Sequence, residues 1–312
     1  MKKHIVFILS VLFCGIAYGQ KKVSPAPSFE SLIKNSKPVV EKVDNGTVNW
    51  TQQYVEAKGQ SVIDTARFKN KAQARAMATR GAIVVAQRNL LEIVKGVNIV
   101  GETTVEDMIT TSDKIQTRVE GVVKGAVQVG DAVIKDGLVE VTMRIPMYSP
   151  DGLAPVLIDS VGKVIEKETA STSKADSVAS DTTLKGVVGK IDASSSKLGA
   201  SAADLSNKPF VFNLNGQKID PSLFPVITDS TGNLVLDLSK FYDPKKGKFP
   251  QYLQLGKDAM KAAGFKKGVE VIDVIQNSNG KFVISEKVKK KINWDKIATV
   301  AKKVGKFALL FL

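Results

Sequence analysis

Histidine and cysteine are almost absent from this sequence. Its 312 residues include one of each, His4 and Cys14. Both precede residue 20, in a segment that we expect to be removed, and a mature chain without them can run neither a Ser-His-Asp nor a Cys-His mechanism. It also lacks the ligands of a His- or Cys-bound zinc site and the thiols of a disulfide. We therefore predict a protein without catalytic residues, metal or cofactor, whose stability comes from packing.

The first 19 residues have the order of a secretory signal peptide. Lys2 and Lys3 form a basic start, an apolar run covers 5–16, and small residues occupy both positions of 17–19 that signal peptidase reads. The apolar run is shorter than the about 20 residues that a membrane-spanning helix needs. We therefore expect cleavage before Gln20 and export to the periplasm or the outer membrane.

Acidic residues are scarce at the C-terminal end. The formal net charge is +14, and residues 245–312 contain 16 lysines against five acidic residues, which leaves +11. A basic surface attracts anionic lipid, acidic wall polymers or nucleic acid. No nucleic-acid-binding motif is present in the sequence, so we expect no nucleic-acid partner. Two interpretations remain, a solvated lysine face and a contact with an anionic surface.

Composition divides the rest of the chain into four segments. Residues 20–46 contain three prolines and little periodicity, which indicates a flexible arm. Residues 47–158 and 208–312 show helix and strand patterns. Between them, 159–207 is rich in Ser, Ala, Thr, Asp and Lys and has no aromatic residue, which is typical of a linker or loosely helical connector. We therefore predict two small α+β domains joined by this linker.

Periodicity and turn residues predict the elements of each domain. In the first, we expect a helix over 69–94 that Gly96 ends, a short helix with turns within 105–123, and strands over 48–57, 97–105, 125–134 and 138–147. Asp136-Gly137 between the last two strands is a hairpin signal. In the second, we expect hairpins over 224–238 and 269–284, helices over 251–263 and 286–304, and a final strand over 307–312.

The first domain carries a recognisable succession of motifs. The run RAMATRGAIVVAQRNLLE extends from Arg75 to Glu92, and it is followed by Gly96-Val97, Glu102-Thr103-Thr104-Val105, Val119-Glu120-Gly121 and Gly137-Leu138-Val139-Glu140-Val141. Over about residues 48–158, this succession resembles the bacterial outer-membrane lipoprotein family of the twenty-kilodalton Lpp type and the related N-terminal domain of flagellar assembly protein T. Residues 223–227 with 232–233 also resemble the C-terminal part of longer members.

The resemblance implies an envelope-associated α+β protein with a structural or assembly role, flagellar-type assembly included, rather than a catalyst. The sequence departs from the family at two points. Phe13, not a small residue, precedes Cys14, so the lipidation signal of many relatives is missing. Val85 stands where many relatives carry an acidic residue, so any role of that carboxylate is absent here.

Arg80, Gln87 and Arg88 are the first candidate binding residues. On a helical wheel of 69–94, Arg80 and Gln87 fall on the same arc as the apolar positions, and a buried arginine must be paired. One interpretation is an internal pair that fixes how helix and sheet dock, with Glu56, Glu102 or Glu120 as the acid. The other is an anion or partner site at Arg80 and Arg88.

Lys289, Lys290 and Lys291 are the second group of candidates. They lie in the helix expected over 286–304, whose apolar residues recur at helical spacing. Such a cationic amphipathic helix can lie on an anionic membrane. The alternative is a surface helix whose apolar stripe packs on its own sheet.

Three functions follow, in order of preference. The first is an exported protein that binds or scaffolds at the bacterial envelope, with another envelope protein, the cell wall or the outer-membrane surface as its partner. The second is an anionic membrane-surface binder that acts through the lysine-rich helix. The third is a carboxylate-dependent hydrolase, which needs two facing acids in a pocket.

Overall fold

The computed structural model describes residues 34, 36–175, 210–255, 270–294 and 308–311. The helices with defined bounds are α2 (Lys71–Lys95), α3 (Val105–Thr111), α4 (Asp113–Lys124), α5 (Ala154–Ala175), η1 (Leu238–Phe241) and α7 (Glu286–Lys291). The strands of the first half are β1 (Lys37–Pro38), β2 (Val40–Val43), β3 (Gly46–Asn49), β4 (Tyr54–Val62), β5 (Asn98–Val100), β6 (Thr103–Thr104), β7 (Val127–Gln128), β8 (Val133–Lys135) and β9 (Leu138–Pro146). Those of the second half are β10 (Phe210–Asn213), β11 (Val226–Asp229), β12 (Leu234–Asp237), β13 (Gln251–Gln254), β14 (Glu270–Ser278), β15 (Lys281–Ile284) and β16 (Ala308–Phe311).

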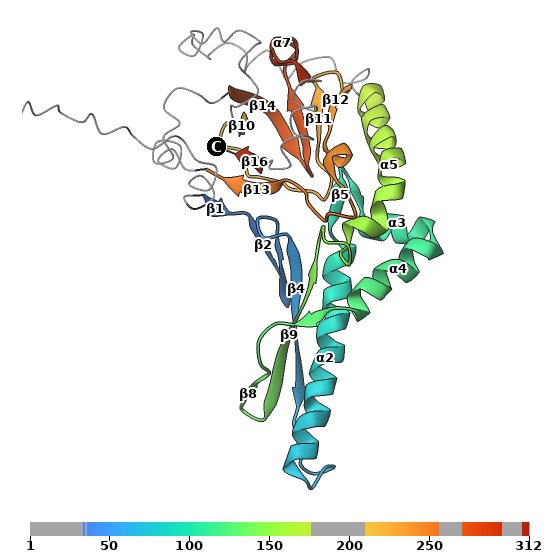
Figure 1. Ribbon diagram of the computed structural model, residues 1–312, viewed down its shortest axis with the longest axis vertical. Helices are drawn as coiled ribbons and strands as arrows, with labels where there is room; N and C mark the ends of the chain where they lie inside the picture. Colours follow the sequence, from blue (N-terminus) through green and yellow to red (C-terminus); the bar gives the residue numbers. More distant parts are fainter. Residues whose placement is uncertain (1–33, 35, 176–209, 256–269, 295–307, 312) are drawn as a thin grey trace, which may run out of the picture.

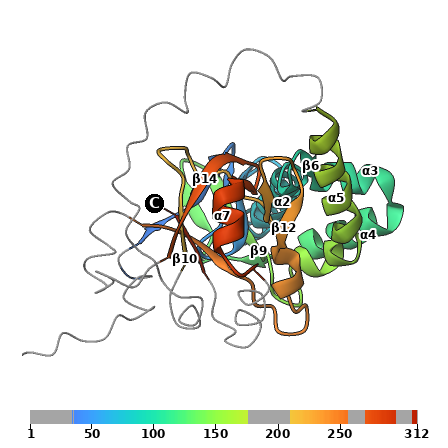
Figure 2. The ribbon, with the colours of Figure 1, turned by 90° about the horizontal axis from the view of Figure 1, so that it is seen from above.

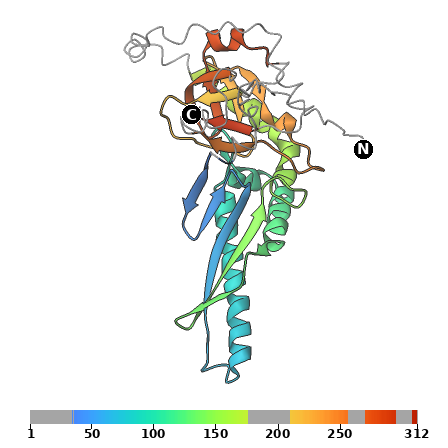
Figure 3. The same cartoon turned by 60° about the vertical axis from the view of Figure 1, so that its left-hand side comes forward.

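A six-stranded antiparallel sheet of order β2-β3-β4-β9-β7, with β8 also paired to β9, carries α2 on one face. Strands β4 and β9 pair over nine residues, from Tyr54 with Pro146 to Val62 with Leu138. Together α2, β4, β8 and β9 extend far beyond the rest of the molecule (Figures 1 and 3). We call these four elements the arm.

Helix α2 lies very close to β4. The α2 residues that face the strands recur every fourth position and are buried: Ala74, Ala78, Ala82, Ala86, Leu90 and Val94. Beneath them lies Gly59, where a methyl group would be 2.2 Å from the Ala82 carbonyl oxygen and 2.2 Å from the Ala86 nitrogen. The two backbones can touch because no side chain larger than a methyl group separates them.

A mixed eight-stranded sheet forms the body, in the order β1-β13-β16-β10-β14-β15-β11-β12. Strand β16 lies inside this sheet, parallel to both β13 and β10. Strand β1 pairs with β13, so segments from both ends of the chain belong to one sheet. Figure 2 shows α3, α4 and α5 grouped on one side of the molecule. None of the helices in the described part of the chain combines the length and apolarity needed to cross a membrane.

The packing joins the two predicted domains. One hydrophobic cluster contains buried residues of both halves. At the junction, the buried Tyr148 hydroxyl donates to the Leu223 carbonyl (2.7 Å), and the Tyr148 ring stacks on Phe249. The Phe224 amide donates to the Ile99 carbonyl. The α+β class is confirmed, but the halves are not separate cores.

The predicted domain boundary lies inside a helix. Helix α5 runs through residue 159, where the linker was expected to begin, and Leu157, Val161 and Ile165 on it are buried. These apolar residues recur every fourth position, which suffices for packing although Ser, Thr and Lys dominate the composition around them. Of the two alternatives for 159–175, the unstructured linker is wrong and the segment is helical, with apolar residues packed in the core. Residues 176–207 and the expected signal peptide lie outside the described residues.

Other local predictions differ in outcome. The long helix is confirmed as α2, and Asp136 (φ 50°) and Gly137 (φ 77°) form the expected hairpin turn. The prediction that residues 20–46 are flexible is wrong in part, because 37–43 contains β1 and β2. A helix was expected over 251–263, but residues 251–254 form strand β13, which pairs with β1 and β16. Residues 256–263 lie outside the described residues.

Candidate binding surface

One face of the six-stranded sheet lies on the side away from α2. Because side chains alternate along a strand, the buried Val55, Ala57 and Gly59 of β4 face α2, and the even-numbered residues of β4 point to the opposite side. Cross-strand partners share a face, so the pairing register identifies the neighbours of these residues in β3, β8 and β9. We call this side the open face.

Exposed valines lie on the open face. Val62 is 66% exposed and Val133 is 58% exposed. Val133 pairs with Glu140, which places it on this side. By the same register, Val40 and Val127 lie on this side and are also exposed. Strands prefer valine where one face packs against another surface, so uncovered valines mark a surface suited to a partner.

Two pairs of oppositely charged side chains lie on the open face. Arg144 donates to Oε2 of Glu56 from Nε (3.0 Å) and from Nη2 (2.7 Å), and its guanidinium lies 3.7 Å from the centre of the Tyr54 ring. Further along the arm, Glu140 accepts hydrogen bonds from Lys58 (2.8 Å) and Gln60 (2.7 Å). These bonds lower the pKa of Glu140, so its carboxylate stays ionised at neutral pH.

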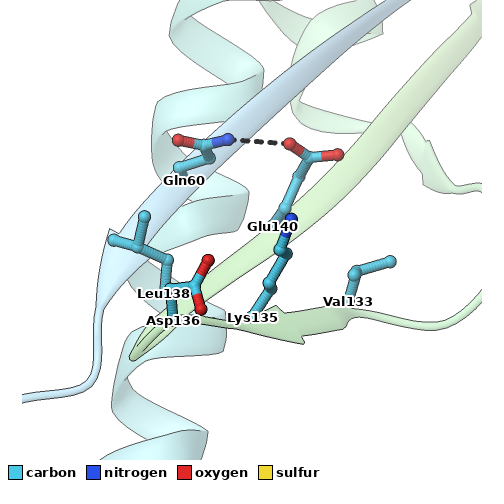
Figure 4. Close-up of a pocket in the computed structure, with 6 residues that line it drawn as sticks. All are labelled: Gln60, Val133, Lys135, Asp136, Leu138 and Glu140. Carbon is cyan, nitrogen blue, oxygen red and sulfur yellow. Dashed lines mark hydrogen bonds between the residues drawn. The ribbon is translucent and has the colours of Figure 1, made fainter.

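A pocket of about 210 Å³ opens on this face beside the β8–β9 hairpin (Figure 4). Its lining residues are Gln60, Val133, Lys135, Asp136, Leu138 and Glu140. Asp136 and Glu140 are its two carboxylates, but both oxygens of Glu140 accept hydrogen bonds. A hydrolase with paired carboxylates needs one acid that is protonated at its working pH. Glu140 is held ionised by these bonds and is therefore unsuited to be that acid.

The prediction that Arg80 lies on the buried side of α2 is wrong. Arg80 and Arg88 are exposed, and Gln87 is half-buried, with its side-chain amide donating to the Lys124 carbonyl (3.3 Å). Glu56, one of the three acids expected as the partner of Arg80, pairs with Arg144 instead. The helical wheel took large apolar residues such as Met77 and Val84 as the buried arc, whereas the structure leaves them exposed and buries the alanines instead. Position 80 lies midway between buried Ala78 and Ala82 and therefore points outward.

Lys289 has an internal partner. Its ammonium group donates to the buried carboxylate of Asp229 and lies 3.6 Å from Glu286. Burial acts to raise the pKa of Asp229, but the hydrogen bonds from Lys289, Thr231 and Asn233 outweigh it and hold that pKa well below its usual range. Asp229 lies in the turn of the hairpin that the sequence predicts over 224–238. The sequence of 229–233 indicates the turn, but it gives no sign that Lys289, 60 residues away, pairs with Asp229.

Helix α7 ends at Lys291, earlier than expected. Lys290 and Lys291 are exposed, while Val288, Ile292 and Trp294 pack on the core of the body. The apolar side of this helix is therefore used internally, and residues 295–307 lie outside the described residues. Figure 1 places α7 at the opposite end of the molecule from the start of α2, so the six candidates do not form one site.

Two groups of features are thus available for binding, the open face and the exposed side of α2. Within the described ranges, no group of three or more His, Cys, Asp or Glu residues is placed to hold a metal ion. Neither a protein-family model nor a curated protein matches this chain.

Proposed function

We propose that this protein is exported to the bacterial cell envelope and there binds or scaffolds another envelope protein through the open face of its arm. The observation that carries the proposal is the set of exposed valines on that face, which four strands contribute: Val40, Val62, Val127 and Val133. Glu56 pairs with Arg144 and Glu140 pairs with Lys58 on this face, which favours an apolar, shape-dependent contact over capture of a charged ligand by these side chains. The resemblance to envelope lipoproteins and to flagellar assembly protein T supports the same class of function.

Export is tested at the N-terminus of the protein in its native cells. We expect the chain recovered from the envelope fraction to begin at Gln20, because the basic start, the apolar run and the small residues of 17–19 form a signal-peptidase substrate. N-terminal sequencing of the purified protein measures this directly. A chain that begins at Met1 and stays with the cytoplasmic fraction contradicts export.

Binding is tested by photo-crosslinking of the full chain in cells. A benzophenone amino acid replaces Val133 on the open face and, in a matched control, Ile275 of β14 in the body. The two side chains are similarly exposed, at 58% and 55%. We expect a discrete adduct from Val133 that mass spectrometry identifies as an envelope protein, and no such adduct from Ile275.

A charged residue introduced on the open face should weaken binding of the partner. Val133→Asp places an unpaired carboxylate in an apolar contact, which weakens binding by about 1–3 kcal/mol. In competition, excess unlabelled wild-type chain should suppress the Val133 adduct and excess Val133→Asp chain should not. Equal adducts from Val133 and Ile275 contradict a binding role of the open face. Adducts with wall polymer or lipid alone assign a different partner.

A further inference from the structure

The exposed side of α2 and the segment just before it carry cations without acids. Between Asp64 and Glu92 the sequence has no acidic residue and six basic ones: Arg67, Lys69, Lys71, Arg75, Arg80 and Arg88. All six are exposed, and none forms an ion pair with another residue that the structure describes. This differs from the open face of the same arm, where Lys58 and Arg144 both have carboxylate partners.

The cations at the start of α2 oppose the helix itself. The N-terminal end of a helix carries a partial positive charge, which favours acidic residues there. The first turn of α2 has no acidic residue and begins with Lys71, and Arg75 follows one turn later. A local charge arrangement that disfavours the helix indicates selection for something other than stability.

Apolar side chains lie between these cations. Met77, Val84 and Val85 are all exposed, and Val84 is one turn from both Arg80 and Arg88 on the side opposite the buried alanines. A helix that presents apolar and basic side chains together is suited to the boundary between lipid head groups and acyl chains. A nucleic acid or a wall polymer would bind the arginines but would leave these apolar side chains in water.

We infer that the solvent-facing half of α2 lies on an anionic lipid bilayer. With 25 residues, α2 is about 37 Å long, and its first half extends beyond α3 and α4 (Figure 1). The arginines and lysines contact the anionic head groups, and Met77, Val84 and Val85 enter the interface. This surface is separate from the open face, so the inference does not depend on the protein partner proposed above.

The test is cosedimentation of the full chain with vesicles of phosphatidylcholine that contain phosphatidylglycerol. The variant is Arg80→Gln/Arg88→Gln, and the control is Lys163→Gln/Lys245→Gln, which removes the same net charge from exposed lysines outside the arm. We expect about thirtyfold weaker partitioning for the first, about fivefold for each lost contact with anionic lipid, and little change for the control. The apolar run of 5–16 is common to all chains and cancels in the comparison.

Three further results distinguish the explanations. Wild-type binding should fall as salt is raised and should be weak on pure phosphatidylcholine. Soluble glycerol phosphate should not compete, and competition would instead indicate a site for a free anion. Equal binding of wild type and the arginine variant, or equal loss in the lysine control, overturns the inference. Because the vesicles contain no protein, failure here leaves the crosslinking result at Val133 unaffected, and the converse also holds.

Discussion

Replacing Gly59 by alanine should lower the free energy of unfolding by about 3 kcal/mol, the upper part of the usual range for overpacking. The added methyl group would lie 2.2 Å from two backbone atoms of α2, the Ala82 oxygen and the Ala86 nitrogen. A flexible side chain could move away, but helix backbone cannot yield without displacing α2 from the sheet. Urea denaturation followed by circular dichroism measures the change.

Gly121→Ala is the matched control for this experiment. Gly121 lies in α4, and a methyl group there meets no atom within 4 Å. Because alanine favours a helix more than glycine does, we expect this variant to gain up to about 1 kcal/mol. The two substitutions add the same atoms and should act in opposite directions. Equal stability of Gly59→Ala and wild type would show that α2 does not lie against β4 as described.

Removing the Asp229 carboxylate should have a comparable effect, about 3 kcal/mol at neutral pH for Asp229→Ala. The carboxylate accepts hydrogen bonds from Thr231 Oγ1 (2.7 Å) and the Asn233 amide (2.9 Å), and it also binds Lys289. The loss therefore removes one ion pair and the acceptor of the hydrogen bonds that hold the turn. It also frees α7 from the β11–β12 turn.

The effect of Asp229→Ala should depend on pH in a defined direction. The pKa of Asp229 is lower in the folded protein than in an unfolded chain, where it is about 3.9. Its contribution to stability is therefore fully present above about pH 5 and declines as the pH falls below about 4. Stability of wild type and variant, measured across this range, should converge in acid.

Asp159→Ala is the control for Asp229. The Asp159 side chain is 83% exposed, and its carboxylate is 4.0 Å from Arg118. Its removal should change stability by less than about 0.5 kcal/mol. If Asp229→Ala costs no more than Asp159→Ala, or if its effect stays constant into acid, the ion pair with Lys289 does not hold α7 in place.

Features set by neighbouring residues could be predicted from the sequence. The long helix was predicted within two residues of α2 at each end, and the turn at Asp136-Gly137 has the backbone angles that this pair favours. Strand β13 could not be predicted, because its partners lie in β1 and β16, more than 50 residues away in either direction. A short apolar run gives no sign of such pairing.

The candidate surfaces could be predicted only in part. The alternating pattern of 54–62 is consistent with a strand that buries one face. The side of α2 that faces that strand is set by Gly59 and by the alanines at every fourth position of α2, because these small residues let the helix and the strand come close together. A wheel that takes large apolar side chains such as Met77 and Val84 as the buried face, in place of the alanines, therefore put Arg80 on the wrong side. Arg80 and Arg88 remain candidate binding residues, but as exposed cations and not as part of a buried ion pair.

The position of β16 has a consequence for the order of folding. Residues 308–311 are synthesised after every other strand of the eight-stranded sheet, yet they lie between β13 and β10. The sheet therefore stays in two separate parts until this strand is inserted, whereas α2, β4 and β9 can pair as soon as residue 146 has been made. Formation of such long-range contacts is slow. A chain that crosses a membrane unfolded would keep its body open until its last strand arrived.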